Sequence, residues 1–335
     1  MDTLTHIVLG ACIGEATAGK VLGRKAMVAG ALAQSIPDID FLAYFWLNQT
    51  DNLLAHRGIT HSVIFGLLVV AGLSAATRKI FHKRNFTWRQ GLLLFGLNVF
   101  CHLFIDAFNA YGVGWFEPFS TARFSFHVLF VADPFFSIWP FLGMLAILVF
   151  NRKAKTKRLA WRLGLGLSLL YLSYAVYNKL SVESAMRKQL KAQQISYESF
   201  FATPSPFNAW LWFVIIKDKK GFYTGYRSVF DTKVIQLSYS PINDSLLREV
   251  KDREEVYNLV RFAQGYYTVE KTNDTLLFNI PRFGKITGWS DLHAKFAFYY
   301  YFDKPGGNEF LIQRGRFKNW NRETGSDFLR RIRGN

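Results

Sequence analysis

The sequence predicts a membrane α-helical bundle of about six helices, two of them short, followed by a small extracytoplasmic α+β domain. Three observations lead to this prediction. Residues 1–180 contain long apolar runs, these runs are separated by alternately basic and non-basic connections, and residues 181–335 change to a mixed composition with strand-like segments. Only 19% of all residues are charged, whereas soluble globular chains carry about 25%.

Four apolar segments come close to the length that a bilayer requires, which is about 20 residues for a helix. They lie at 62–77, 90–108, 135–150 and 163–180. Two weaker segments precede them at 4–18 and 25–36, and both are rich in Gly and Ala. Because small residues let membrane helices approach closely, these two are expected to be short helices packed inside the bundle.

The basic residues alternate along this helical part. They cluster between the two short helices, at 78–89 and at 152–162, whereas the connections 37–61 and 109–134 hold only Arg57 and Arg123. The positive-inside rule therefore predicts a multi-pass protein of the cytoplasmic (inner) membrane, with the basic connections in the cytoplasm. The two non-basic connections and the C-terminal domain are expected on the extracytoplasmic side.

The formal net charge of +17 raises nucleic acid as a partner. The positive-inside pattern already accounts for much of this charge, so no nucleic-acid partner is expected. The two cysteines, Cys12 and Cys101, both lie in apolar stretches. They are expected to be small core residues rather than a disulfide or a metal knuckle.

Residues 181–335 are expected to form a soluble α+β domain. Its prolines in ATPSPFNAW, residues 202–210, argue against regular structure there. A helical pattern is expected at 245–264. Strand-like runs follow the proline segment at 210–216, 222–230, 266–270, 275–280 and 295–302.

Ionisable side chains at the outer ends of the predicted helices are the strongest functional signal. Such residues are costly in a membrane and are usually functional. Four separate segments carry them to the same side: THIVLG, PDID, HRGITHS and HLFID. The predicted metal ligands are His6, Asp38, Asp40, His56, His61, His102 and Asp106.

The spacing of these residues fits metal binding. His102 and Asp106 are four apart and would share one face of a helix. Asp38 and Asp40 flank one residue, so an extended turn would point both carboxylates the same way. Imidazoles with carboxylates suit a divalent transition metal, zinc or manganese above all, and the number of ligands is sufficient for two ions.

A catalytic role follows for three of the polar residues. Asp40 or Asp106 is expected to act as the general base toward a metal-activated water. The forked guanidinium of Arg57 would neutralise a phosphate oxygen.

Each of these residues also has a structural interpretation. A single membrane histidine is usually a hydrogen-bonded core residue, a PDxD turn usually ends a helix, and an arginine at a membrane edge usually contacts headgroups. The convergence of four segments favours the metal site over these separate explanations. His127 and Asp133, in the connection before 135–150, are left with two alternatives, outer ligands of the site or unrelated residues.

The motifs THIVLG, PDID, HRGITHS and HLFID, in this order, resemble the YdjM-like membrane-bound metal-dependent hydrolases. That family's pattern is THxxxG, PDxD, HRGxTHS and HxxxD, and the resemblance covers residues 1–180. It implies a metal-dependent hydrolase and, by position, the site residues named above together with Arg57. The stretches ATPSPFNAWLW and LFNIPRFG are similar to segments of longer members, although an acidic residue expected before RFG is absent here.

The sequence thus predicts a hydrolase that cleaves an amphipathic or lipid-linked ester, in particular a phosphoester, at the outer face of the membrane. A membrane lipid or a lipid-linked molecule is the expected substrate. Two alternatives remain at this point. The His/Asp cluster could mark the ion pathway of a metal transporter, or a structural metal could hold together a non-catalytic regulatory or assembly protein.

Overall fold

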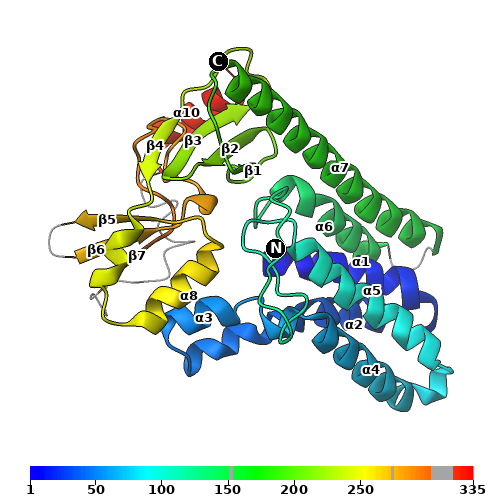
Figure 1. Cartoon of the computed structure of the whole chain (residues 1–335). Coiled ribbons are helices and arrows are strands. Elements are labelled where there is room, and N and C mark those ends of the chain that lie inside the picture. The colour runs from blue at the N-terminus through cyan, green and yellow to red at the C-terminus, as the bar shows by residue number, and fades with distance from the viewer. Residues whose placement is uncertain (151–153, 273–274, 303–319, 335) are drawn as a thin grey trace. The chain divides into compact units, whose positions relative to one another are not determined.

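The computed structural model describes residues 1–335 except 151–153, 273–274, 303–319 and 335. The chain divides into two compact units, Met1–Tyr174 and Ala175–Asn335. The first unit is helical and the second contains two antiparallel sheets (Figure 1). A helical N-terminal region followed by a sheet-containing part confirms the broad fold class expected from the sequence.

The first unit is built from α-helices and short 3₁₀ helices (Figure 1). The 3₁₀ helices of this unit are η1 (Pro37–Phe45), η2 (Ile59–His61) and η3 (His82–Arg84). The α-helices are α1 (Thr3–Leu22), α2 (Arg24–Ser35), α3 (Gln49–Ala55), α4 (Val63–Ile80), α5 (Trp88–Asp106), α6 (Pro134–Val149) and the beginning of α7 (Ala154–Ala192).

Three described helices are long and apolar enough to cross a membrane, namely α4, α5 and α7. The helix α6 is also apolar but has only 16 residues. The helix α7 includes the predicted span at 163–180 and continues beyond it to Ala192, in one run of 39 residues. The three long helices are consistent with a membrane location.

The helices α1 and α2 pack closely because glycines face each other across their contact. A Cβ atom built on Gly10 would lie 2.5 Å from the carbonyl oxygen of Gly30. A Cβ atom on Gly14 would collide with the carbonyl oxygen of Ala26. Real side chains do not tolerate such distances, so the small residues of these two segments permit the close approach, as expected from the sequence. Only α2, with 12 residues, is short; the expectation of a short first helix is wrong, because α1 continues to Leu22 and has 20 residues.

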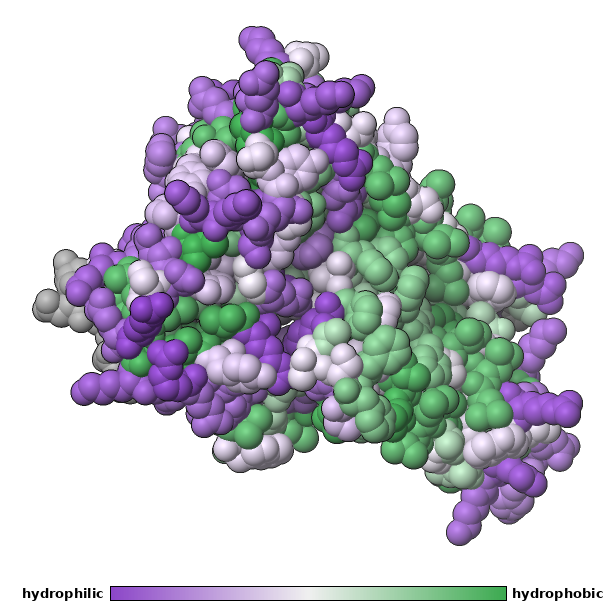
Figure 2. All heavy atoms as spheres, viewed as in Figure 1, coloured by the Kyte–Doolittle hydropathy of each residue, from purple (hydrophilic) through white to green (hydrophobic). Residues whose placement is uncertain are grey.

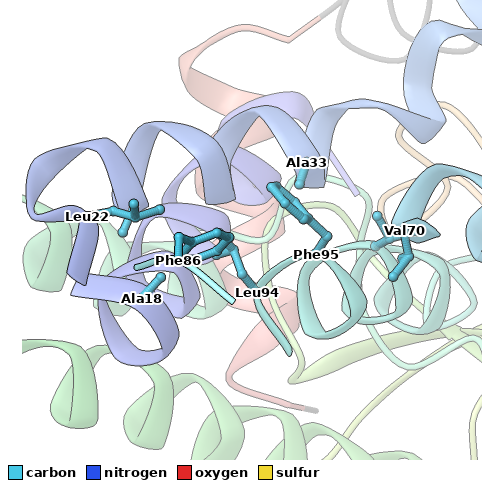
Figure 3. Close-up of a cluster of buried hydrophobic side chains, with 9 residues drawn as sticks. Ala18, Leu22, Ala33, Val70, Phe86, Leu94 and Phe95 are labelled. Carbon is cyan, nitrogen blue, oxygen red and sulfur yellow. The ribbon is translucent and has the colours of Figure 1, made fainter. Parts of the chain in front are cut away.

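An apolar cluster joins α1 and α2 to α4 and α5 (Figure 3). Leu22, Phe86, Leu94 and Phe95 are almost completely buried in it. In a bilayer, side chains of this size stabilise a helix bundle through close packing, because lipid is as apolar as the core. The cluster therefore fixes the helices whose other ends carry the His and Asp residues.

Figure 2 shows hydrophobic residues gathered over the helices of the first unit, with hydrophilic residues at the helix ends. Many apolar side chains of α4 to α7 are exposed, among them Leu68 at 68% and Leu170 at 65%. A water-soluble bundle would bury such a surface, whereas lipid covers it in a membrane.

The second unit contains two antiparallel sheets. One sheet has the order β1-β2-β3-β4 and the other the order β5-β6-β7. The strands are β1 (Ser199–Pro204), β2 (Leu211–Lys217), β3 (Gly221–Ser228), β4 (Ser238–Pro241), β5 (Thr268–Thr272), β6 (Thr275–Asn279) and β7 (Tyr299–Tyr301). The helices of this unit are the end of α7, η4 (Asp244–Glu249), α8 (Arg253–Ala263), η5 (Pro281–Phe283) and α10 (Arg322–Ile332).

Two predictions for this unit are wrong. The proline segment does contain regular structure, because β1 ends at Pro204, and an edge strand tolerates a residue without an N–H donor. The helix expected at 245–264 is divided into η4 and α8 by residues 250–252. Asp252 ends the break by capping α8, since its side chain accepts hydrogen bonds from the amides of Glu254 and Glu255.

Candidate metal centre

His102 and Asp106 lie on the last two turns of α5, four residues apart as predicted. Both side chains are fully buried, and His102 Nε2 lies 3.7 Å from Asp106 Oδ2. The helix keeps both groups on one face, which is the arrangement that an i,i+4 pair of metal ligands requires.

The segment HRGITHS brings His61 to the same place. The helix α3 ends at Ala55, the short η2 follows, and Ser62 caps the first turn of α4. This cap lets the chain turn from loop to helix directly after His61. The fully buried His61 ring has its Nε2 atom 3.3 Å from Asp106 Oδ2 and 3.1 Å from His102 Nε2.

The segment PDID supplies the two remaining carboxylates, but not from an extended turn. That prediction is wrong, because Pro37 begins the 3₁₀ helix η1, and the fixed φ of proline suits the first turn of a helix. The carboxylates approach the His61 ring from opposite sides. Asp38 Oδ1 lies 3.7 Å from His61 Nε2, and Asp40 Oδ2 lies 3.6 Å from His61 Nδ1.

Four side chains converge into one group that could hold a metal ion: Asp38, His61, His102 and Asp106. Five donor–donor distances within this group lie between 3.1 and 3.7 Å. Ligands about 2.0–2.1 Å from a tetrahedral ion would be about 3.3–3.4 Å apart. These five distances are compatible with one ion bound by all four side chains.

Contacts around this group engage the His102 nitrogen and the Asp106 oxygen that face away from it, which leaves His102 Nε2 and Asp106 Oδ2 to face a bound ion. His102 Nδ1 lies within hydrogen-bonding distance of the Gln34 backbone oxygen, which can only accept, so His102 presents its Nε2 lone pair to the group. His6 stacks on His102 and contacts the other oxygen of Asp106, with Nε2 3.1 Å from Oδ1. His6 thus contacts both His102 and Asp106 without belonging to the four-residue group.

Arg57 is buried beside the same carboxylate. Its Nε atom lies 3.0 Å from Asp106 Oδ2, and its Nη1 donates a 2.7 Å hydrogen bond to Asn109 Oδ1. The Met1 amino group also forms an ion pair with Asp106. The guanidinium of Arg57 therefore neutralises a site carboxylate and is only 3% exposed.

His56 is placed apart from the four converging residues. Its Nδ1 lies 3.2 Å from Asp40 Oδ2, and the Arg57 backbone N–H donates a 2.7 Å hydrogen bond to the same oxygen. The His56 side chain is 42% exposed and that of Asp38 is 23% exposed. These two residues mark the side from which solvent reaches the group.

The charges of the η1 carboxylates are stabilised by this surrounding. Burial opposes the ionisation of Asp38, but the hydrogen bond with His61 and the nearby imidazoles hold the pKa of this carboxyl below its usual value. Burial also opposes the ionisation of Asp40, but the hydrogen bond and the charge interaction with His56 outweigh this effect, so the pKa of Asp40 is lowered. Both groups therefore offer charged oxygens at neutral pH.

The remaining predicted residues lie elsewhere or serve other contacts. Asp133 caps α6, accepting from the amides of Phe135 and Phe136, and it accepts a 3.0 Å hydrogen bond from the Tyr171 hydroxyl. His127 has a left-handed backbone conformation with φ 51°. Neither residue belongs to the four-residue group.

Two supporting residues were missed in the sequence. Gln34 supplies the carbonyl for His102, and its side-chain Oε1 lies 3.3 Å from His6 Nδ1. Asn109 accepts from Arg57. The signal for Gln34 was its position as a single amide in the apolar run AGALAQS, because a buried amide needs a partner.

Comparisons with known proteins find one family and two relatives. Residues 1–182 match the family described as YdjM inner membrane protein. The inner membrane protein YbcI of Escherichia coli (strain K12) is 30% identical over 127 residues, which cover 36% of this chain and 69% of YbcI. The uncharacterized protein YfhP of Bacillus subtilis (strain 168) is 32% identical over 147 residues, which cover 41% of this chain and 43% of YfhP. No solved structure matches the chain.

Proposed function

Because this chain belongs to the YdjM family of inner membrane proteins, we propose that it is a membrane-embedded metal-dependent hydrolase. Its substrate is an amphipathic or lipid-linked ester, in particular a phosphoester. The reaction takes place at the extracytoplasmic face of the inner membrane.

The observation that carries this proposal is the spacing of the donor atoms of Asp38, His61, His102 and Asp106, which lie within 4.8 Å of one another. Two imidazoles and two carboxylates suit zinc or manganese, and a set of four such donors would suit zinc. We propose one ion at this position. It would act as a Lewis acid on the ester and on the attacking water.

The protein's own groups have separate tasks in this mechanism. Asp106 serves as a ligand, so the general base is assigned to Asp40 acting with His56. Asp40 fixes the His56 ring through Nδ1, and the exposed ring can then exchange a proton with the substrate or with water. We assign Arg57 a role other than phosphate binding, on the basis of its contacts with Asp106 and Asn109. Its guanidinium holds Asp106 in position and balances its charge.

The extracytoplasmic placement rests on the charges at the two ends of α5. Asp106 is the last residue of this helix. The connection before its first residue carries Lys83, Arg84 and other cations, which favour the cytoplasm. A helix of 19 residues then brings the site to the opposite face.

The hydrolase proposal is tested with the purified full chain reconstituted in lipid vesicles. We expect release of the headgroup from a phospholipid or polyprenyl phosphoester, abolished by His102→Ala and by a chelator, and unchanged by His82→Ala. Full activity of His102→Ala would refute the proposal. Metal uptake into the vesicles that is lost in Asp38→Ala, without any hydrolysis, would instead identify a transporter.

A further inference from the structure

The 3₁₀ helix η1 and the two residues after it present an unusual row of exposed apolar side chains. Between residues 39 and 47, every residue except Asp40 and Ala43 is a large hydrophobic residue with 36–73% of its surface exposed. Phe45 and Trp46 are the most exposed, at 73% and 69%. A protein surface in water rarely keeps such a row uncovered.

The same helix carries Asp38 and Asp40, two carboxylates at the metal centre. Pro37 and Asp40 are buried, and Asp38 Oδ1 belongs to the four-residue donor group. Residues three apart share a face of a 3₁₀ helix, so Asp40 lies on the buried face, whereas Asp38 is in line with the exposed Phe41 and Tyr44. The partly exposed Asp38 lies next to Ile39, which is 40% exposed, so the open side of the site adjoins the apolar row.

The helices α2 and α3, on either side of η1, indicate that lipid covers this apolar row. The helix α2 leads into η1 and exposes Val28 and Leu32 at 60% and 63%. The apolar surface of the helical unit thus continues into η1. The row ends at Asn48, whose side chain caps the polar start of α3. Tyr and Trp near such an end are typical of the boundary between lipid and water.

We propose that η1 inserts its apolar row into the acyl layer of the membrane beside the metal centre, and that the acyl chain of the substrate lies along this row. The headgroup then reaches Asp38 and His56 from the membrane rather than from bulk water. The second part of this inference rests on the proposed hydrolase function, whereas the insertion of η1 does not.

Insertion is tested on the full chain in vesicles of phosphatidylethanolamine and phosphatidylglycerol that carry brominated acyl chains. A bimane label is attached to Phe45→Cys in a background with Cys12 and Cys101 replaced by alanine. We expect the bromines to quench this label, and to quench little or none of a matched label on Gln49→Cys in α3. As a check that needs no label, the brominated lipid should quench less tryptophan fluorescence in Trp46→Phe than in the wild type.

The role in substrate binding is tested with the double variant Phe41→Ser and Phe45→Ser. We expect the ratio of hydrolysis rates for a long-chain and a short-chain phosphoester to fall by about tenfold or more, because two apolar contacts with the acyl chain are lost. Tyr257→Ser, an exposed aromatic residue of α8 in the second unit, is the control and should leave this ratio unchanged.

The outcomes separate this inference from the hydrolase proposal. Quenching at residue 45 without any hydrolysis by the wild type would refute the proposed function and support insertion. Hydrolysis by the wild type without quenching at residue 45 would overturn the inference, and η1 would then be covered by protein, either the second unit or another copy of the chain. An unchanged rate ratio in the double variant would overturn the acyl-chain role.

Discussion

The Nε2 atoms of His61 and His102 lie 3.1 Å apart, and both side chains are fully buried. The Nδ1 atom of His102 faces a backbone oxygen that can only accept a hydrogen bond. The Nε2 atom of neutral His102 therefore carries a lone pair directed at the other ring. Two imidazole nitrogens at this distance must share either a proton or a metal ion, and the carboxylates of Asp38 and Asp106 complete a ligand set around the second possibility.

Removing one of the four ligands should release the ion. We expect His102→Ala to weaken zinc binding by more than about 100-fold, because losing even an outer partner of a ligand costs about 10–100-fold. Isothermal titration of the detergent-purified protein measures this affinity. His82→Ala, in the exposed η3, is the matched control. An unchanged affinity in His102→Ala would place the ion elsewhere.

His6 should support the site without being a ligand. In His6→Ala, Asp106 Oδ1 loses a contact of 3.1 Å and the His102 ring loses its stacking partner. We expect zinc affinity to fall by about 10–100-fold while one ion still binds at saturation. Loss of all binding in this variant would instead make His6 a ligand, as the sequence had suggested.

Arg57 should be required for stability as well as for the site. Arg57→Ala leaves the buried Asp106 carboxylate without its guanidinium partner, and breaking a buried ion pair typically costs about 3–5 kcal/mol. We expect a lower thermal unfolding midpoint of the metal-free protein in detergent. A double variant with Asp106→Asn should recover part of this loss. A midpoint equal to the wild type would show that the pair contributes no net stability.

Metal affinity should decrease in acid, and earlier than an isolated histidine would predict. Burial alone would lower the pKa of His61, but the hydrogen bonds with the Asp106 and Asp38 carboxylates outweigh it and raise this pKa. Only the neutral ring binds metal, so protons compete increasingly as the pH falls through a value above the ordinary one of about 6.5. Zinc titrations from about pH 8 to about pH 5.5 measure this decrease. A constant affinity over this range would contradict the assignment of His61 as a ligand.

The close packing of α1 and α2 should also be necessary. Gly14→Val would drive a side chain into the Ala26 carbonyl, whereas a Cβ atom on Gly72 in α4 meets nothing within 4 Å. We expect Gly14→Val to lower the yield of folded protein and its metal content, and Gly72→Ala to leave both intact. Size-exclusion profiles and metal content provide the comparison. A normal yield and metal content of Gly14→Val would contradict the close contact between α1 and α2.

The sequence predicted those parts of the site that depend on local periodicity. The four-residue spacing of His102 and Asp106 on an apolar run was sufficient to place both on one helix face. The apolar run that follows HRGITHS was sufficient to place His61 at the end of a predicted helix. The meeting of separate segments at one end of the bundle followed from the charges of their connections.

Other features depend on contacts that spacing does not reveal. The contact of His56 with Asp40, rather than with the metal ligands, depends on the path of η1. The sequence does not reveal this path, because Pro37 is compatible with both an extended turn and a 3₁₀ helix. The same holds for Arg57, because only the fold shows that its guanidinium is enclosed by Asp106 and Asn109. In the second unit, Pro204 argued against a strand, although its edge position removes the objection.

The central claim is that Asp38, His61, His102 and Asp106 hold one transition-metal ion. Anomalous diffraction from crystals of the full chain, collected at the zinc and manganese absorption edges, tests this claim most directly. We predict a single strong anomalous peak within bonding distance of all four side chains. An anomalous peak at other residues, or the absence of any peak in protein saturated with both metals, would contradict the account.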